Sequence, residues 1–343
     1  MLKNSLRIKI TTPLIVQLPN LVKNIAAISL NRWQRDIITK GQMQKENAEN
    51  IEKEKEKKEQ EKKQENIDKE LKDSTSVSND GTKSHGEILK QQIIEGQETY
   101  DRNPRSILLS SITAGLEIGF SYLLLCTVFS FFSDSVSESA LFKIMALVYP
   151  VGFILVILGQ SILFTEQTSL LTLPVLNNKR GIRSLFKIWG IVIAGNLLGG
   201  YIMAILLVWI GPKLHIFEHF AIEKIAEHVT DYNGIVIFVS AILAGWLMGL
   251  LSWLITSARD SMSRIILIFI VTATMAFTGL HHSIIGSVEV FAGMLVSPNI
   301  VFLDYLKFQS FALIGNSIGG GVFVALLKYR AFVYNIDMER RNY

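Results

Sequence analysis

The feature that most constrains this chain is a series of long apolar segments between residues 106 and 330. Six segments with few charges cover approximately residues 106–133, 142–175, 185–210, 233–258, 263–290 and 309–330. An α-helix needs roughly 20 apolar residues to cross the hydrocarbon core of a bilayer. The sequence therefore predicts an all-α integral membrane protein with six membrane-spanning helices whose outer surface contacts the lipid bilayer.

The charged residues outside these segments predict how the spans are oriented. Lys and Arg are absent from residues 134–141 but are frequent in residues 177–187, in 259–264 and after residue 327, whereas residues 211–232 carry more acids than bases. Loops on the cytoplasmic side of a membrane are enriched in Lys and Arg. This alternation and the even number of spans predict an inner (plasma) membrane protein with both termini in the cytoplasm.

Residues 1–83 are predicted to be a polar cytoplasmic extension, separate from the membrane-spanning region. The Lys/Glu/Gln tract at residues 42–73 has too few apolar residues to form a core, which is typical of a solvated helix or a disordered segment. For the basic residues before Asp36, a cytoplasmic extension, a misassigned start and an organelle-targeting leader all remain open.

The remaining polar regions flank the spans. Residues 84–105 open with a capping box of Ser84 and Glu87, and we expect them to form an amphipathic helix on the cytoplasmic membrane surface. Residues 331–343 are predicted to be a cytoplasmic tail. The six-span domain therefore comprises residues 106–330.

The six spans consist of two copies of a three-span unit. Span 1 contains Ala114-Gly-Leu-Glu-Ile-Gly119 and span 4 contains Ala244-Gly-Trp-Leu-Met-Gly249, while spans 3 and 6 contain Gly195-Asn-Leu-Leu-Gly-Gly200 and Gly315-Asn-Ser-Ile-Gly-Gly320. Because each copy has an odd number of spans, the copies are inverted repeats. The glycines are interpreted as sites of close helix packing. The motif residues that we expect to be structural are Gly195, Asn196, Gly199, Gly315, Asn316 and Gly319.

The middle span of each copy, span 2 or span 5, is interrupted by a polar sequence. The interruptions are Leu163-Phe-Thr-Glu-Gln-Thr168 and Leu280-His-His-Ser-Ile-Ile285, the second lying between Gly279 and Gly286. When Leu163 is matched with Leu280, they precede the Gly-Asn motifs by 33 and 36 residues. A lone histidine there would as readily be a helix–helix hydrogen-bonding residue. Two matched breaks instead predict a substrate path between the repeats, because broken helices at membrane depth line protein-enclosed cavities.

These motifs resemble the formate/nitrite transporter family over about residues 84–330. The resemblance rests on Leu163-Phe-Thr followed by Gly195-Asn196, and on His282-Ser-Ile followed by Gly315-Asn316-Ser-Ile-Gly-Gly-Gly. Glu95-Gly, Arg102-Asn-Pro104 and Gly119-Phe-Ser121 are similar to a less characterised bacterial inner-membrane branch. The resemblance implies an aquaporin-like fold, a homopentamer with one pore per subunit, no cofactor, and transport of small monovalent anions such as formate, nitrite, hydrosulfide, acetate or lactate.

The resemblance also implies roles for individual residues. His282 matches the central pore histidine of the family, and Thr165 matches the threonine of the span-2 loop that faces it. Leu163 and Phe164 would form apolar constrictions in the same loop, and Arg264 takes the place of a lysine at the cytoplasmic approach. The other candidate pore residues are Glu166, His281 and Ser283.

The sequence departs from the family pattern at four positions. The asparagine usual four residues after the histidine is Gly286, and the asparagine usual in span 4 is Trp246. Glu166 beside Thr165 and His281 beside His282 are not typical of formate-conducting members. These departures bear on the identity of the substrate and not on the fold.

A histidine near the midplane suits anion transport for a physical reason that does not depend on the family. A bare carboxylate pays a large desolvation penalty there, whereas a neutral weak acid crosses far more easily. Histidine has an unperturbed pKa near 6.5, so it can either lend a proton to the anion or attract it while cationic. The sequence leaves both roles open for His282.

Other classes of function fit the sequence less well. His281 and His282 are adjacent, so on a helix their side chains point about 100° apart, and no third ligand has metal-like spacing. No Walker loop is present to power an ATP-driven pump. We therefore expect no metal site, no enzymatic activity and no nucleic-acid partner. Two alternatives remain: a facilitator for small neutral solutes, and a membrane sensor or scaffold that uses the charged N-terminal tract.

Overall fold

The computed structural model describes residues 45, 50–72 and 83–339, and the chain divides into two units, Met1–Glu65 and Asn66–Tyr343. In the first unit, residues 50–65 are helical. This helix carries two exposed ion pairs, Lys58–Glu54 at 3.1 Å and Lys57–Glu61 at 3.9 Å, which contribute little in water. The possible leader and most of the predicted linker, within residues 1–44 and 73–82, lie outside the described residues.

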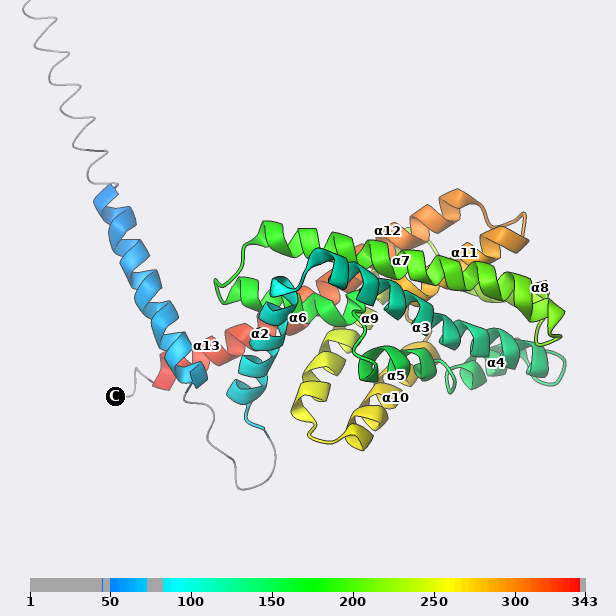
Figure 1. The fold of residues 1–343 in the computed structure, drawn as a ribbon, viewed down its shortest axis with the longest axis horizontal. Coiled ribbons are helices and arrows are strands. Elements are labelled where there is room, and N and C mark those ends of the chain that lie inside the picture. The colour runs from blue at the N-terminus through cyan, green and yellow to red at the C-terminus, as the bar shows by residue number, and fades with distance from the viewer. Residues whose placement is uncertain (1–44, 46–49, 73–82, 340–343) are drawn as a thin grey trace, which may run out of the picture. The chain divides into compact units, whose positions relative to one another are not determined.

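The described part of the second unit is built from helices (Figure 1). Their bounds are α2 His85–Asp101, α3 Pro104–Phe132, α4 Glu138–Met145, α5 Pro150–Leu158, α6 Phe164–Leu176, α7 Ile182–Lys213, α8 His219–Thr230, α9 Gly234–Ser257, α10 Ser261–Phe277, α11 Ser283–Val296, α12 Phe302–Ile318, the π-helix η1 Gly319–Leu326 and α13 Leu327–Glu339. The last helix therefore continues past residue 330, where the sequence predicts the last span to end.

These helices form the six predicted spans. Span 1 is α3, span 3 is α7, span 4 is α9, and span 6 is α12, η1 and the start of α13. Span 2 consists of α4, α5 and α6, and span 5 of the shorter apolar helices α10 and α11. The predicted fold class is confirmed: the protein is an all-α membrane protein of two inverted three-span repeats, with interruptions in spans 2 and 5.

Glycines let the long helices of each repeat pack closely, α3 against α7 and α9 against α12 (Figure 1). A Cβ atom at Gly199 would lie 2.0 Å from the carbonyl oxygen of Ile112, and one at Gly319 would lie 2.2 Å from that of Ile242. Gly195 and Gly315 make the corresponding contacts, with Ser111 and Ala241. Side chains at these positions would force the helices apart.

Helix α2 lies against protein on the apolar face that the sequence predicts to contact lipid. It packs on α6 and α9, and the Gln92 side chain donates hydrogen bonds to the hydroxyls of Ser252 at 3.0 Å and Thr256 at 2.8 Å. Ile67 and Leu71 are buried in a hydrophobic cluster with apolar residues of α2, although the sequence suggested that their tract has too few apolar residues to form a core. The face of the membrane domain that carries α2 is its α2 side, and the opposite face, which carries α8, is its α8 side.

Candidate functional site

The breaks in spans 2 and 5 have the same construction. Two residues after α5 and α10 end, the backbone takes a left-handed conformation, at Gln160 (φ 58°) and Gly279 (φ 69°). The next amide, of Ser161 or Leu280, donates a 3.0 Å hydrogen bond back to the carbonyl five residues earlier. This backbone hydrogen bond terminates α5 and α10 inside the protein, and the chain is then extended until α6 or α11 begins.

A buried asparagine from the following span holds the first break. The Asn196 Oδ1 accepts a hydrogen bond from the Phe164 amide at 2.8 Å, and its Nδ2 donates to the carbonyl oxygens of Ser111 and Ile162, both at 2.8 Å. Side-chain amide groups can satisfy both donors and acceptors of an unwound backbone. We call this set of contacts an asparagine clamp. It joins span 1, the break in span 2, and span 3.

The second break has the equivalent clamp. The Asn316 Oδ1 accepts from the Ser283 amide at 2.8 Å, and its Nδ2 donates to the carbonyls of Ala241 at 2.7 Å and His281 at 3.2 Å. The clamps therefore pair Leu163 with His282, the residues just before the two clamped amides. The predicted pairing of Leu163 with Leu280 is wrong by two residues, because it matched polar character and not backbone geometry.

His282 begins helix α11 and contacts Thr165 across the repeat boundary. Its Nδ1 accepts hydrogen bonds from the amides of Ile284 at 3.3 Å and Ile285 at 3.4 Å, so the neutral ring carries its proton on Nε2. The Nε2 lies 2.7 Å from the Thr165 hydroxyl and donates to it. The Phe153 ring packs edge-on against the imidazole, with centroids 5.2 Å apart. The histidine is 2% exposed, so this contact is buried inside the domain.

The His282–Thr165 contact also joins the N-termini of two short helices. Thr165 lies in the first turn of α6, and His282 is the N-cap of α11. The N-terminus of a helix carries a partial positive charge, which favours anions nearby. Half-helices that end near the middle of a membrane protein are typical of transporter sites. The centre of the domain is therefore polar in a way that suits a negatively charged solute.

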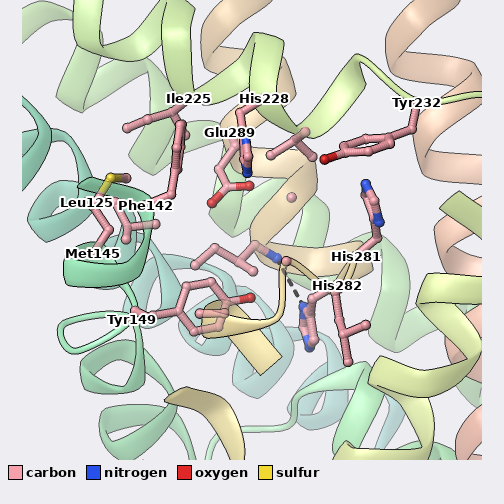
Figure 2. A pocket seen from close by; sticks show the side chains of 17 residues that line it. Leu125, Phe142, Met145, Tyr149, Ile225, His228, Tyr232, His281, His282 and Glu289 are labelled. Atoms are coloured by element: carbon pink, nitrogen blue, oxygen red, sulfur yellow. Dashed lines mark hydrogen bonds between the residues drawn. The ribbon is translucent and has the colours of Figure 1, made fainter. Parts of the chain in front are cut away.

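A cavity of about 90 Å³ lies on the α8 side of His282 (Figure 2). Its walls are mainly aromatic and aliphatic, with polar side chains that come from α8, α11 and the connecting segments. A wider hollow of about 570 Å³ adjoins it, and the residues that line both are Phe142, His228, Tyr232, Ala276, Gly279, Leu280 and His281. The polar side chains that Figure 2 labels around the smaller cavity are Tyr149, His228, Tyr232, His281, His282 and Glu289.

His281 lines both hollows. Its Nδ1 lies 2.8 Å from the Ser240 hydroxyl, its ring packs edge-on against Tyr232, and 6% of the residue is exposed. The expected 100° divergence from His282 does not apply, because both residues precede the first turn of α11. Among the residues that the structure describes, no group of three His, Cys, Asp or Glu side chains could hold a metal ion.

The other predicted site residues lie on the α2 side of this contact or at its edge. Leu163 and Phe164 are fully buried, and the Phe164 ring packs edge-on against Trp189 at 5.7 Å. Glu166 is half-buried in the first turn of α6. Arg264 lies in the first turn of α10, at the opposite end of that helix from the break, so the structure does not bring it to His282.

Two of the departures from the family pattern, Gly286 and Trp246, have structural reasons. A Cβ atom at Gly286 would lie 2.3 Å from the Phe308 ring, so an asparagine would not fit there. Trp246 is 37% exposed and stacks on Phe323, which places it on the outer surface and not in the cavity. Ser283 is fully buried, and its hydroxyl has no hydrogen-bond partner among the described residues.

The sequence did not single out several residues of the α8-side cavity. Tyr149 lies between α4 and α5, and His228 and Tyr232 lie on or just after α8, in segments that resemble ordinary connections. The His228 ring stacks on Phe142 with centroids 3.6 Å apart, and burial lowers the pKa of His228. Glu289 could have been identified from the sequence as a candidate site residue, since it is a lone acid within an apolar helix.

Known proteins match this chain over most of the membrane domain. The family model described as formate/nitrite transporter matches residues 86–330. The inner membrane protein YfdC of Escherichia coli (strain K12) is 30% identical over 283 residues, which cover 81% of this chain and 88% of that protein. The nitrite transporter NirC of the same organism is 27% identical over 236 residues, covering 65% and 82%.

Solved structures share the fold at lower sequence identity. A structure described as "FNT family ion channel" aligns with a TM-score of 0.65 and 22% identity, covering 71% of this chain and 98% of that one. A structure described as "Pentameric formate channel with formate bound" aligns with a TM-score of 0.58 and 21% identity, covering 67% and 98%. The residues that the family model matches include both repeats, both asparagine clamps and the His282–Thr165 contact. The chain belongs to the formate/nitrite transporter family.

Proposed function

We propose that this protein is a membrane pore for small monovalent anions or their weak acids, of the formate and nitrite type. The observation that carries the proposal is the 2.7 Å contact between His282 Nε2 and Thr165 Oγ1, at the meeting point of two half-helices and next to a cavity. Family membership and the relatives named for nitrite and formate transport support this class of solute.

The pair acts as a polar gate in an otherwise apolar passage. Phe153, Leu163 and Phe164 surround it with buried apolar side chains, which makes passage of a bare anion costly. The Nε2 proton of His282 and the Thr165 hydroxyl offer hydrogen bonds to a solute with acceptor oxygens. A monovalent anion that gains a proton, or that is bound by these donors, crosses the constriction at lower cost than an unassisted ion.

The proposal extends to the oligomeric state of the protein and to its orientation in the membrane. A homopentamer with one pore per subunit is supported by the second structural neighbour, which is a pentameric formate channel. The Lys and Arg residues of the α2-side loops support a cytoplasmic location for that face and for both termini. The α8-side cavity then opens toward the outside of the inner membrane. A monomeric mass by native mass spectrometry in mild detergent would contradict the pentamer.

Flux measurements with the purified protein in liposomes test the proposal. Formate, nitrite, hydrosulfide, acetate and lactate are offered one at a time, with empty liposomes as the control. Uptake of at least one of them above the control is the expected result. Uptake of neutral solutes without any dependence on these anions would favour the neutral facilitator, and no uptake at all would favour the sensor or scaffold.

A further inference from the structure

Glu289 is a buried carboxyl group that the proposed gate does not use. It is 6% exposed and lies on α11, seven residues beyond His282, which is about 10 Å along the helix axis. Figure 2 shows its carboxyl group directed into the α8-side cavity. In the part of the chain that the structure describes, it has neither an ion pair nor a hydrogen bond to another side chain.

The groups that face Glu289 supply no compensating cation. The residues that line its cavity include no Lys or Arg. An ionised carboxylate in such surroundings is costly, so the neutral carboxylic acid is the favoured form of this side chain. The titratable groups that face it, from every element packed around it, are Tyr122 and Cys126 of α3, Tyr149, His228 of α8, Tyr232, His281 and His282.

We propose that Glu289 is the proton-loading residue of the pore. An anion that enters the cavity takes the proton of the Glu289 carboxyl group: the O–H bond of Glu289 breaks and an O–H bond forms on the solute. The neutral acid then moves to the His282–Thr165 gate. A hydronium ion from the aqueous phase on the α8 side then returns a proton to the Glu289 carboxylate and leaves water. This inference rests on the proposed function and adds a proton donor to it.

The position of Glu289 gives this step a direction. Glu289 and His282 line the same small cavity. The residues that this cavity shares with the wider hollow are Phe142, His228, Tyr232, Ala276, Gly279, Leu280 and His281. An anion in this cavity therefore reaches the carboxyl group without passing the gate. An unprotonated Glu289 repels a second anion by its charge until it has been reloaded. The gate then receives solute that already carries a proton.

The test uses the full-length protein in liposomes, with formate as the probe and a pH-sensitive dye inside. Glu289→Gln keeps the shape of the side chain and removes the transferable proton. We expect its formate flux to fall about tenfold from pH 6 to pH 7, because undissociated formic acid falls about tenfold per pH unit. The wild-type flux should fall much less over this range, and Glu289→Asp should retain the wild-type slope.

The matched control is Glu117→Gln, the same change at an acid of α3 that does not line the cavity. It should retain the wild-type pH profile. A Glu289→Gln protein with wild-type flux and slope would overturn the inference while leaving the proposed function intact. A wild-type protein that transports none of the small anions would overturn both. A sodium-dependent flux that Glu289→Gln abolishes would make the residue a cation ligand and also overturn proton loading.

A chemical probe keeps the inference testable if the variant does not assemble. Dicyclohexylcarbodiimide reacts with protonated carboxyl groups in apolar surroundings, and mass spectrometry locates the adduct. The wild-type protein in liposomes should be modified at Glu289 near neutral pH. An unmodified Glu289 under conditions that label other membrane carboxyl groups would contradict a protonated, solute-accessible side chain.

Discussion

Replacing Asn316 with alanine should remove the clamp that holds the second break. The change deletes three hydrogen bonds, of 2.8, 2.7 and 3.2 Å, that tie spans 4, 5 and 6 together. A hydrogen bond contributes about 1 kcal/mol net, and somewhat less on average between membrane helices, so the expected loss of unfolding free energy is roughly 2–4 kcal/mol. At about 2–4 °C per kcal/mol for a domain of this size, the melting temperature should fall by roughly 4–16 °C.

Thermal unfolding in detergent, followed by tryptophan fluorescence, measures this change, and size-exclusion chromatography checks that the oligomer is intact. The matched control is Ser317→Ala, the next residue along, whose hydroxyl donates only to the Leu313 carbonyl within its own helix. Its melting temperature should stay within about 2 °C of the wild type, since isolated losses of this kind are small. A shift for Asn316→Ala no larger than that of Ser317→Ala would refute the clamp as the element that holds the break.

The remaining predictions concern single side chains. His282→Ala should abolish or reshape the pH-dependent flux of small anions between pH ~5 and ~8, around the unperturbed histidine pKa. His281→Ala should have less effect, because only His282 contacts Thr165. Loss of the pH-dependent flux in His281→Ala alone would reverse this assignment. Gly320→Ala should lower the melting temperature, because its Cβ would lie 1.9 Å from the Thr168 hydroxyl, whereas Gly190→Ala, with nothing within 4 Å, should not. Burial lowers the pKa of His228, so falling pH protonates this histidine in the unfolded chain before the folded one. The melting temperature should therefore decrease from pH 7 to 5, and His228→Gln should lessen that decrease; an unchanged decrease would contradict it.

The all-α membrane fold could be predicted from the sequence because its signals are local. Span length is set by the bilayer, and a repeated motif such as Gly195-Asn196 and Gly315-Asn316 can be read without knowing the fold. The interrupted spans followed from polar residues that an intact, lipid-facing helix would not carry. The contact between Thr165 and His282, which the family resemblance implied, is present at hydrogen-bonding distance.

The sequence could not supply features that depend on backbone geometry or on distant segments. The correct pairing of Leu163 with His282 depends on which amide each asparagine binds, and that is visible only in three dimensions. The environment of Glu289 depends on α8, a connecting helix whose residues have no obvious link to the pore. The apolar face of α2 meets protein because α6 and α9 leave a surface for it, which periodicity alone does not distinguish from lipid.

The asparagine clamps have a consequence for how such pores diversify. The His282 imidazole also accepts hydrogen bonds from two amides of α11, but both asparagines bind backbone groups alone, so the clamps themselves do not depend on the side chains at the paired positions Leu163 and His282. The two halves already illustrate this freedom, since one position is aliphatic and the other is an imidazole. A duplicated gene can therefore exchange the chemistry at the centre of the pore, residue by residue, while the architecture around it is inherited unchanged. Protein engineers can use the same freedom by placing new polar groups at residue 163.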